Sequence, residues 1–143
     1  MQNFEESLPM LMNRALDAIM PRYRAVFSNY KITEQQWRIL RVLWEQERCP
    51  ATTLAEKTLI PGPSMVGIID RLANKGLVQR TRSAADRRRV YVEATKEGKK
   101  LQSKIAPQID KVYADLRKQS GAADWKALTR TLQKFIDTNE ENS

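Results

Sequence analysis

The stretch that decides the fold runs from Arg80 to Gly98 and reads RTRSAADRRRVYVEATKEG. Two short runs of strand-like composition, Leu77 to Thr81 and Val90 to Ala94, flank a polar loop, and this pattern predicts a β-hairpin. Five arginines lie between residues 80 and 89, against the single acid Asp86. Like charges at this density repel one another, so the hairpin is either a solvated, charged turn or a wing that touches a nucleic-acid backbone or minor groove.

The positive charge of the whole chain is concentrated around this hairpin. The chain has 143 residues and a formal net charge of +8. Residues 70 to 100 contain ten Lys and Arg and four Asp and Glu, which gives this segment +6. Such a distribution favours nucleic acid as the partner over an anionic membrane surface. The length suits one domain, or one compact unit with a helical extension.

Composition also excludes several classes of site. The chain has no histidine, which removes imidazole bases, His-based triads and most zinc sites, and its single cysteine, Cys49, allows no internal disulfide. Acids such as Asp110 and Asp115 are predicted on helix surfaces without a pocket signature. We therefore expect no catalytic residues, no metal and no cofactor. No signal peptide and no apolar run of about 20 residues is visible, so we expect a cytoplasmic protein without a membrane partner. Cys49 precedes a proline, and we expect it to be inert.

Apolar residues at helical spacing predict a first helix over residues 7–29, with a kink or break near Pro21. Thr33 with Gln36 has the spacing of a capping box and begins a second helix, which ends before Cys49-Pro50. A short third helix over 54–58, capped by Thr52 or Thr53, is followed by turn residues. A fourth helix over 64–75 then ends at Gly76, completing a helix-turn-helix arrangement.

Two further helices follow the hairpin, one from residue 96 with a bend at Pro107 and one after Gly121. The fold class is therefore mainly α with a small β-hairpin, namely a winged helix-turn-helix DNA-binding domain with long helices. Residues 33–95 form the DNA-binding domain, and residues 1–32 and 96–143 form a helical dimerisation region. The long helices have apolar stripes that the small domain cannot cover, which predicts a homodimer. A monomer that folds these helices onto its own core is the alternative.

In this arrangement, the fourth helix enters the major groove of double-stranded DNA and the hairpin reaches the backbone or the minor groove. Asp70 is adjacent to Arg71 and could neutralise it, while Asp86 and Arg88 could pair within the hairpin turn. The alternative for each of these side chains is a solvated surface position. The residues expected to contact DNA are Pro63, Ser64, Gly67, Arg71, Lys75, Arg82, Arg87, Arg88 and Arg89.

Two motifs resemble the MarR family of bacterial transcription regulators. One is Asp86-x-Arg88-x-x-x-Val92-x-x-Thr95-x-x-Gly98, which is similar to the wing signature of that family. The other is Ile32-Thr33-x-x-Gln36-Trp37-x-Ile39-Leu40, which is similar to its second-helix opening. The order of helices and hairpin also fits, so the resemblance covers nearly the whole chain. Leu11-x-x-Arg14 together with residues 33–39 is similar to the subgroup that represses homoprotocatechuate and related aromatic-acid degradation operons. Ala94 departs from the pattern, which usually has leucine there.

The resemblance implies a dimeric repressor that binds a pseudo-palindromic operator in double-stranded DNA. It also implies release when a small aromatic carboxylate binds between the dimerisation helices and the winged domain. A guanidinium can take a carboxylate bidentately and an aromatic ring can stack on another, so we expect the effector site at Met10, Arg14, Trp37 and Arg38. The alternatives are that Trp37 is a core residue and that the arginines are solvated.

Three classes of function follow from these observations. A ligand-responsive transcriptional regulator, acting as a repressor of an aromatic-compound catabolic operon, accounts for the wing, the helix-turn-helix and the unpartnered long helices together. An architectural or ligand-independent winged-helix DNA-binding protein, or a winged helix used for protein contacts, accounts for the first two. An enzyme has no support in the residue pattern.

Overall fold

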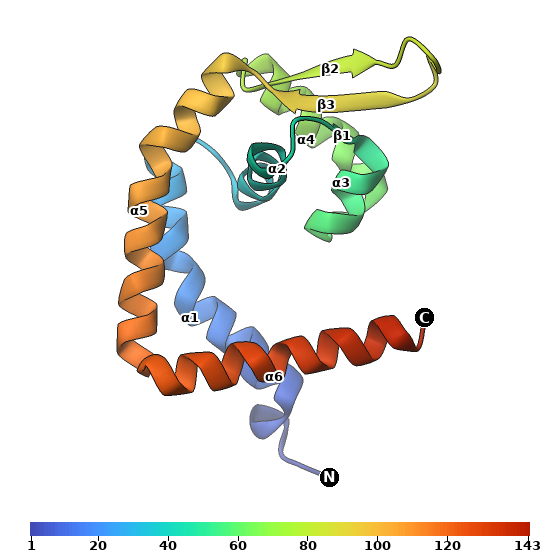
Figure 1. The fold of residues 1–143 in the computed structure, drawn as a ribbon. Coiled ribbons are helices and arrows are strands. Elements are labelled where there is room, and N and C mark those ends of the chain that lie inside the picture. The colour runs from blue at the N-terminus through green and yellow to red at the C-terminus, as the bar shows by residue number, and fades with distance from the viewer. The chain divides into compact units, whose positions relative to one another are not determined.

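The protein, described here from a computed structural model, is defined over all 143 residues and is mostly helical (Figure 1). The chain divides into two compact units, Met1–Pro107 and Gln108–Ser143. The elements, in chain order, are a short 3-10 helix at Phe4–Glu6, α1 Leu8–Asn29, α2 Glu34–Glu45, β1 Cys49–Pro50, α3 Ala51–Thr58, α4 Gly62–Asn74, β2 Val78–Arg82, β3 Val90–Ala94, α5 Lys96–Ser120 and α6 Ala122–Glu141.

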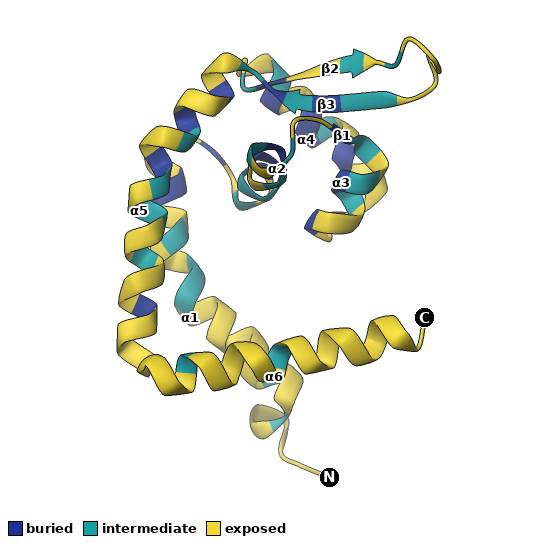
Figure 2. Cartoon of the chain, in the orientation of Figure 1, coloured by how far each residue is buried: buried dark blue, intermediate teal, exposed yellow.

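The core of the first unit forms around α2, which packs against α1, α3, α4 and β3. On α2, Ile39 and Leu40 are fully buried. Figure 2 shows buried segments on α2, α4, β3 and α5. From α1 comes Phe27, whose ring centroid lies 5.0 Å from that of Trp37 on α2. Burying a large apolar side chain of this kind stabilises a domain by roughly 1.5–3 kcal/mol. Because α1, α3, α4 and β3 all contact α2, α2 lies at the centre of this core. The remaining buried apolar positions in this unit include Leu43, Leu54, Met65, Ile68, Ile69, Leu72, Val78, Val92 and Ile105.

The capping box predicted at the start of α2 is confirmed. The Thr33 hydroxyl accepts a hydrogen bond from the Gln36 N–H at 3.1 Å, and Gln36 Oε1 accepts one from the Thr33 N–H at 3.1 Å. Two N–H groups at the start of the helix therefore have partners that the helix itself cannot supply.

Two helix starts differ from the prediction. The third helix begins at Ala51 and not at Leu54, and neither Thr52 nor Thr53 caps it, because Pro50 occupies the capping position. The fourth helix begins at Gly62 with Pro63 in its first turn, two residues before the predicted start. Proline has the backbone φ of a helix and needs no N–H partner in the first turn, so Pro63 lies within α4, whereas Pro50 directly precedes α3.

The sheet has a third strand that the sequence did not predict. The hairpin strands β2 and β3 pair antiparallel as expected, with Arg80 opposite Val92. The two-residue strand β1 pairs with the other edge of β3, with Cys49 opposite Val92. A strand of two residues is too short to produce a periodic signal, so only the tertiary pairing defines it.

The long first helix is confirmed with bounds Leu8–Asn29, but it continues through Pro21 without a break. Proline lacks a backbone N–H, so one hydrogen bond of the helix is missing, while the backbone hydrogen bonds of the turns on either side hold the helix together. Only Val26 and Phe27 of α1 are buried, while Leu8, Leu11, Met12 and Leu16 are exposed.

The hairpin connects to α5 through a close backbone contact. The Thr95 N–H donates to the Leu77 carbonyl at 3.0 Å, and the Gly98 N–H donates to the Thr95 hydroxyl at 3.1 Å. A Cβ placed on Gly98 would lie 2.2 Å from the Leu77 carbonyl oxygen. From α2, Trp44 Nε1 donates to the Gly98 carbonyl at 3.0 Å. The Thr95-x-x-Gly98 spacing thus fixes the first turn of α5 against the start of the hairpin.

In the second unit, the end of α5 and α6 meet at an aromatic pair. Trp125 Nε1 donates to the Tyr113 hydroxyl at 3.1 Å, and the two rings lie edge to face at 5.0 Å. The helix break predicted at Gly121 is confirmed, and this residue has φ of 88°. Along α6, Leu128, Phe135 and Ile136 are exposed. No helix of either unit is long and apolar enough to cross a membrane.

Substitution of Gly98 tests the close approach at the start of α5. We expect Gly98→Ala to lower the free energy of unfolding by about 1–3 kcal/mol, because the added Cβ overlaps a backbone oxygen that cannot rotate away. Gly62→Ala is the matched control, since a Cβ there meets no atom within 4 Å. Urea denaturation of both variants measures the difference, and equal stability of the two would contradict this close approach.

Candidate nucleic-acid interface and adjoining cavity

The helix α4 has one buried and one exposed face. Met65, Ile68, Ile69 and Leu72 pack into the core, and Pro63, Ser64, Val66 and Arg71 are exposed. The Ser64 N–H donates to the Pro61 carbonyl at 3.0 Å, so only its hydroxyl is available to a phosphate. The exposed face is therefore polar at its start and cationic at Arg71.

Asp70 pairs differently from the expectation. Its carboxylate binds the guanidinium of Arg80 on β2 at 2.5 Å, and Arg80 also donates to the Val66 carbonyl at 3.3 Å. Arg80 is thereby held against α4, while the Arg71 guanidinium has no hydrogen bond or ion pair and is therefore not neutralised by Asp70. Gly67 leaves room beside it, because a Cβ there would lie 3.8 Å from the Arg71 guanidinium. The expectation that Asp70 neutralises Arg71 was wrong, because adjacent residues on a helix point in different directions.

Lys75, the residue after the last turn of α4, has protein partners. Its ammonium donates to the Lys31 carbonyl and, at 3.0 Å, to Gln36 Oε1. The structure therefore holds Lys75 on the turn between α1 and α2.

The tip of the hairpin is shaped by hydrogen bonds to the backbone. Asp86 Oδ1 accepts from the Arg88 N–H at 3.0 Å, so the expected Asp86–Arg88 pairing exists but uses the backbone and not the guanidinium. Ser83 Oγ accepts from the Ala85 and Asp86 N–H groups. The Arg82 guanidinium donates to the Arg87 carbonyl at 3.0 Å. These hydrogen bonds fix the loop while leaving its positive charge without an ion-pair partner.

The arginines of the tip fall into two groups. Arg87 and Arg88 are exposed, and their guanidinium groups have no hydrogen bond or ion pair. Arg89 lies 5.9 Å from the ring centroid of Tyr91, and Arg48, from the segment before β1, lies 4.4 Å from the same centroid. No sequence pattern indicates Arg48, because its proximity to the hairpin depends on the pairing of β1 with β3.

A cavity of about 580 Å³ lies where α1 and α2 meet. Three of the four residues predicted for the effector site line it: Met10, Trp37 and Arg38. Arg14 does not, since its guanidinium pairs with Glu5 at 3.2 Å. The other lining residues, which the sequence analysis did not single out, are Asn13, Leu16, Asp17, Met20, Arg24 and Glu34.

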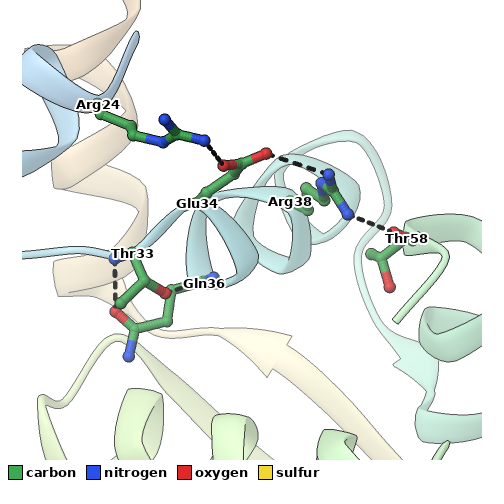
Figure 3. Close-up of polar contacts among 6 residues, drawn as sticks. All are labelled: Arg24, Thr33, Glu34, Gln36, Arg38 and Thr58. Atoms are coloured by element: carbon green, nitrogen blue, oxygen red, sulfur yellow. Dashed lines mark hydrogen bonds and ion pairs between the residues drawn. The ribbon is translucent and has the colours of Figure 1, made fainter. Parts of the chain in front are cut away.

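Glu34 joins the two arginines of this cavity. Its carboxylate contacts Arg24 at 3.4 Å and Arg38 at 3.1 Å, and Arg38 also donates to the Thr58 carbonyl at 3.3 Å (Figure 3). Glu34 and Arg38 have the i, i+4 spacing that the sequence displays, but only the fold brings Arg24 to them. With Asp17, the charged lining consists of two acids and two arginines.

Trp37 contributes both to the core and to the cavity. Its ring packs on Phe27 and lies 6.2 Å from the ring of Tyr23, so the interpretation as a core residue is correct for the ring. Its Nε1 is buried and has no hydrogen-bond partner. A buried N–H without an acceptor costs about 1–3 kcal/mol, and a ligand oxygen at this position would satisfy it.

Cys49 is fully buried in β1. Burial raises the pKa of the thiol, and the nearby Lys57 only partly offsets this. Because the thiolate is the reactive form, these surroundings favour an unreactive residue, as the sequence analysis expected. The structure contains no group of three or more Cys, Asp or Glu side chains placed to hold a metal ion.

Comparison with known sequences places these features in a family. The sequence profile of the MarR family matches residues 32–90. The homoprotocatechuate degradative operon repressor of Escherichia coli is 35% identical over 131 residues, which covers 92% of this chain and 88% of that protein. The transcriptional regulator FarR of Neisseria gonorrhoeae is 38% identical over 78% of this chain and 77% of its own length.

Solved structures agree with the sequence comparisons. NadR in complex with 4-hydroxyphenylacetate superposes with a TM-score of 0.79 at 32% identity, covering 94% of this chain and 96% of that chain. BpsR of Bordetella bronchiseptica, studied for regulation of its DNA binding by 6-hydroxynicotinic acid, superposes with a TM-score of 0.86 at 25% identity, over 96% and 98% of the two chains. The fold is also that of an E. coli MarR variant solved with operator DNA, with a TM-score of 0.85 at 21% identity over 95% and 99%.

The hairpin arginines provide a direct test of the interface. The slope of log K against log salt becomes less negative by about 0.9 for each phosphate that the protein no longer neutralises. Replacing Arg87, Arg88 and Arg89 together with alanine should therefore make the slope less negative by roughly 2–3. The matched control replaces Lys118, Lys126 and Lys134 with alanine, which removes the same charge from exposed positions in the other unit. Fluorescence anisotropy with a duplex at several salt concentrations gives the slope, and an unaltered slope in the hairpin variant would place the wing outside the interface.

Proposed function

Because this chain belongs to the MarR family of DNA-binding transcription regulators, which are not enzymes, we propose that it is a homodimeric repressor of an aromatic-compound catabolic operon. In this proposal it binds a pseudo-palindromic operator in double-stranded DNA and is released by a small aromatic carboxylate. The observation that carries the proposal is the cavity at α1 and α2, which is lined by two arginines and by Trp37, whose buried indole N–H has no partner, and which lies within the same unit as the winged helix.

In the DNA complex, α4 enters the major groove and the hairpin reaches the adjacent backbone or minor groove. The exposed face of α4 supplies Pro63, Ser64, Gly67 and Arg71. Arg87 and Arg88 supply the free charges of the wing, because neither guanidinium is committed to a protein partner. Arg82 and Arg89 support the shape of the tip and add to its positive potential.

The effector in this proposal replaces Glu34. A carboxylate that enters the cavity would pair with Arg24 and Arg38, the two guanidinium groups that Glu34 now joins. The aromatic ring would pack against Met10 and Trp37, and a polar substituent would accept the Trp37 N–H. The relative bound to 4-hydroxyphenylacetate supports an effector of this class, with a carboxylate at one end and a hydroxyl at the other.

The helical dimerisation region at residues 1–32 and 96–143 is proposed from exposed apolar side chains. On α1 these are Leu8, Leu11, Met12 and Leu16, and in the second unit Tyr113, Leu128, Phe135 and Ile136. Exposure of such helix faces to water is unfavourable, so a second copy of the chain is the natural cover.

The effector proposal predicts ligand-dependent release of DNA. With a duplex that the protein itself selects from random sequence, saturating 4-hydroxyphenylacetate or a related phenylacetate, benzoate or cinnamate should weaken binding by roughly 5- to 150-fold in a gel-shift titration. Trp37→Phe retains an aromatic ring and removes the N–H, so its affinity for the effector should fall by about 1 kcal/mol. DNA affinity unchanged by every member of the panel would refute the effector proposal.

The dimer is tested by light scattering coupled to size exclusion. We expect the mass of two chains for the natural protein and a shift toward one chain for Leu128→Glu, because a carboxylate buried in an apolar interface costs several kcal/mol. Lys126→Glu, also on α6 and exposed, should leave the mass unchanged. A natural chain that elutes with the mass of a single copy would contradict the dimer.

A further inference from the structure

The end of α4 is attached to the turn between α1 and α2 by a single side chain. Lys75 Nζ donates both to the Lys31 carbonyl and to Gln36 Oε1. Lys31 has φ of 55°, a left-handed conformation that non-glycine residues rarely adopt. The carbonyl of Lys31 accepts from the ammonium, so this hydrogen bond joins the turn to the end of α4.

One oxygen atom serves two elements at this point. Gln36 is 3% exposed, and its Oε1 accepts the Thr33 N–H at 3.1 Å and the Lys75 ammonium at 3.0 Å. An amide oxygen has two lone pairs, so both are used. The atom that completes the cap of α2 is therefore also the atom that holds the end of α4. A movement of the first turn of α2 therefore alters the hydrogen bond between Lys75 and Gln36 Oε1.

The same helical turn faces the cavity on its other side. Figure 3 shows Glu34 directed toward Arg24 and Arg38 while Gln36 is directed the opposite way, toward Thr33. Glu34 lines the cavity of about 580 Å³, and Gln36 is two residues further along the chain. One turn of α2 thus presents the Glu34 carboxylate to the cavity and the Gln36 amide to Lys75 at the end of α4.

We propose that Gln36 and Lys75 are positioning residues that carry the occupancy of the cavity to α4. This inference rests on the proposed function and identifies the hydrogen bond through which it is regulated. A carboxylate that pairs with Arg24 and Arg38 displaces Glu34, and the first turn of α2 moves. Lys75 passes this movement to the end of α4. The two states differ in a discrete hydrogen bond, which is the physical element that coupling between two sites requires.

Four variants separate coupling from stability and from charge. Lys75→Met removes the ammonium and keeps the length of the side chain, and Lys75→Arg keeps a donor. Gln36→Glu keeps an acceptor oxygen and the capping box, which accepts Glu at this position. Lys99→Met removes the same charge from an exposed lysine without a side-chain partner. Thermal denaturation first establishes that each variant is folded, and Lys75→Gln replaces the methionine variant if that one is not.

The measured quantity is the ratio of the DNA dissociation constants with and without saturating 4-hydroxyphenylacetate. Removal of one charge changes both constants alike and leaves this ratio unaffected. We expect a ratio of roughly 5–150 for the natural chain, Lys75→Arg, Gln36→Glu and Lys99→Met, and below about 2 for Lys75→Met. Calorimetry should show that Lys75→Met still binds 4-hydroxyphenylacetate. A ratio of roughly 5–150 in both Lys75→Met and the natural chain would overturn the inference.

A second measurement without the effector tests the Lys75 hydrogen bond if 4-hydroxyphenylacetate does not act. Coupling is reciprocal, so DNA binding alone should alter hydrogen exchange of the amides at residues 33–37. We expect this change in the natural chain and in Lys99→Met, and its absence in Lys75→Met. The same change in all three, or no change in the natural chain bound to DNA, would overturn the inference. A ratio of 1 in the natural chain combined with the expected exchange pattern would refute the effector proposal alone.

Discussion

The burial of α2 is the constraint on which the rest of the first unit depends. Its inward face is sealed by side chains from α1, α3, α4 and β3, and Trp44 at its far end bonds the backbone of α5. A displacement that exposed Ile39 or Leu40 to water would cost roughly 1.5–3 kcal/mol for each side chain. The helices α1, α3 and α4 and the strand β3 therefore have defined positions relative to one central element within this unit.

Both ends of α2 can serve as attachment points because the middle is fixed. At its start, a capping box and an ion-paired acid occupy the same turn, next to the cavity and to the end of α4. At its end, Trp44 reaches the first turn of α5, where Gly98 allows two backbones to approach. Hydrogen bonds, and not bulk apolar packing, hold the elements together at these two points. A hydrogen bond is either made or broken, so each of these points can have two discrete arrangements.

The interface and the cavity were predictable to different degrees. Hairpin, capping box and amphipathic helices are local, because each depends on residues within a few positions of one another. The partners of individual charges are not local. Asp70 binds Arg80 and not the adjacent Arg71, Lys75 binds a distant turn, and Arg24 reaches Glu34 from another helix. The sequence shows which residues are charged and how far apart they lie in the chain. The partner of each side chain depends on which faces of the helices meet.

The sequence by itself determined the helical fold class, the basic wing and the family, since these depend on periodicity, local charge and short motifs. Tertiary structure alone decided that Cys49 belongs to a strand, that Arg14 lies outside the cavity and that Trp37 has an N–H without an acceptor. The same holds for the arginine hairpin, whose charge is evident in the sequence. Which arginine side chains are committed to the protein was settled by acceptors that only the fold brings within reach, namely the Arg87 carbonyl for Arg82 and the Asp70 carboxylate for Arg80.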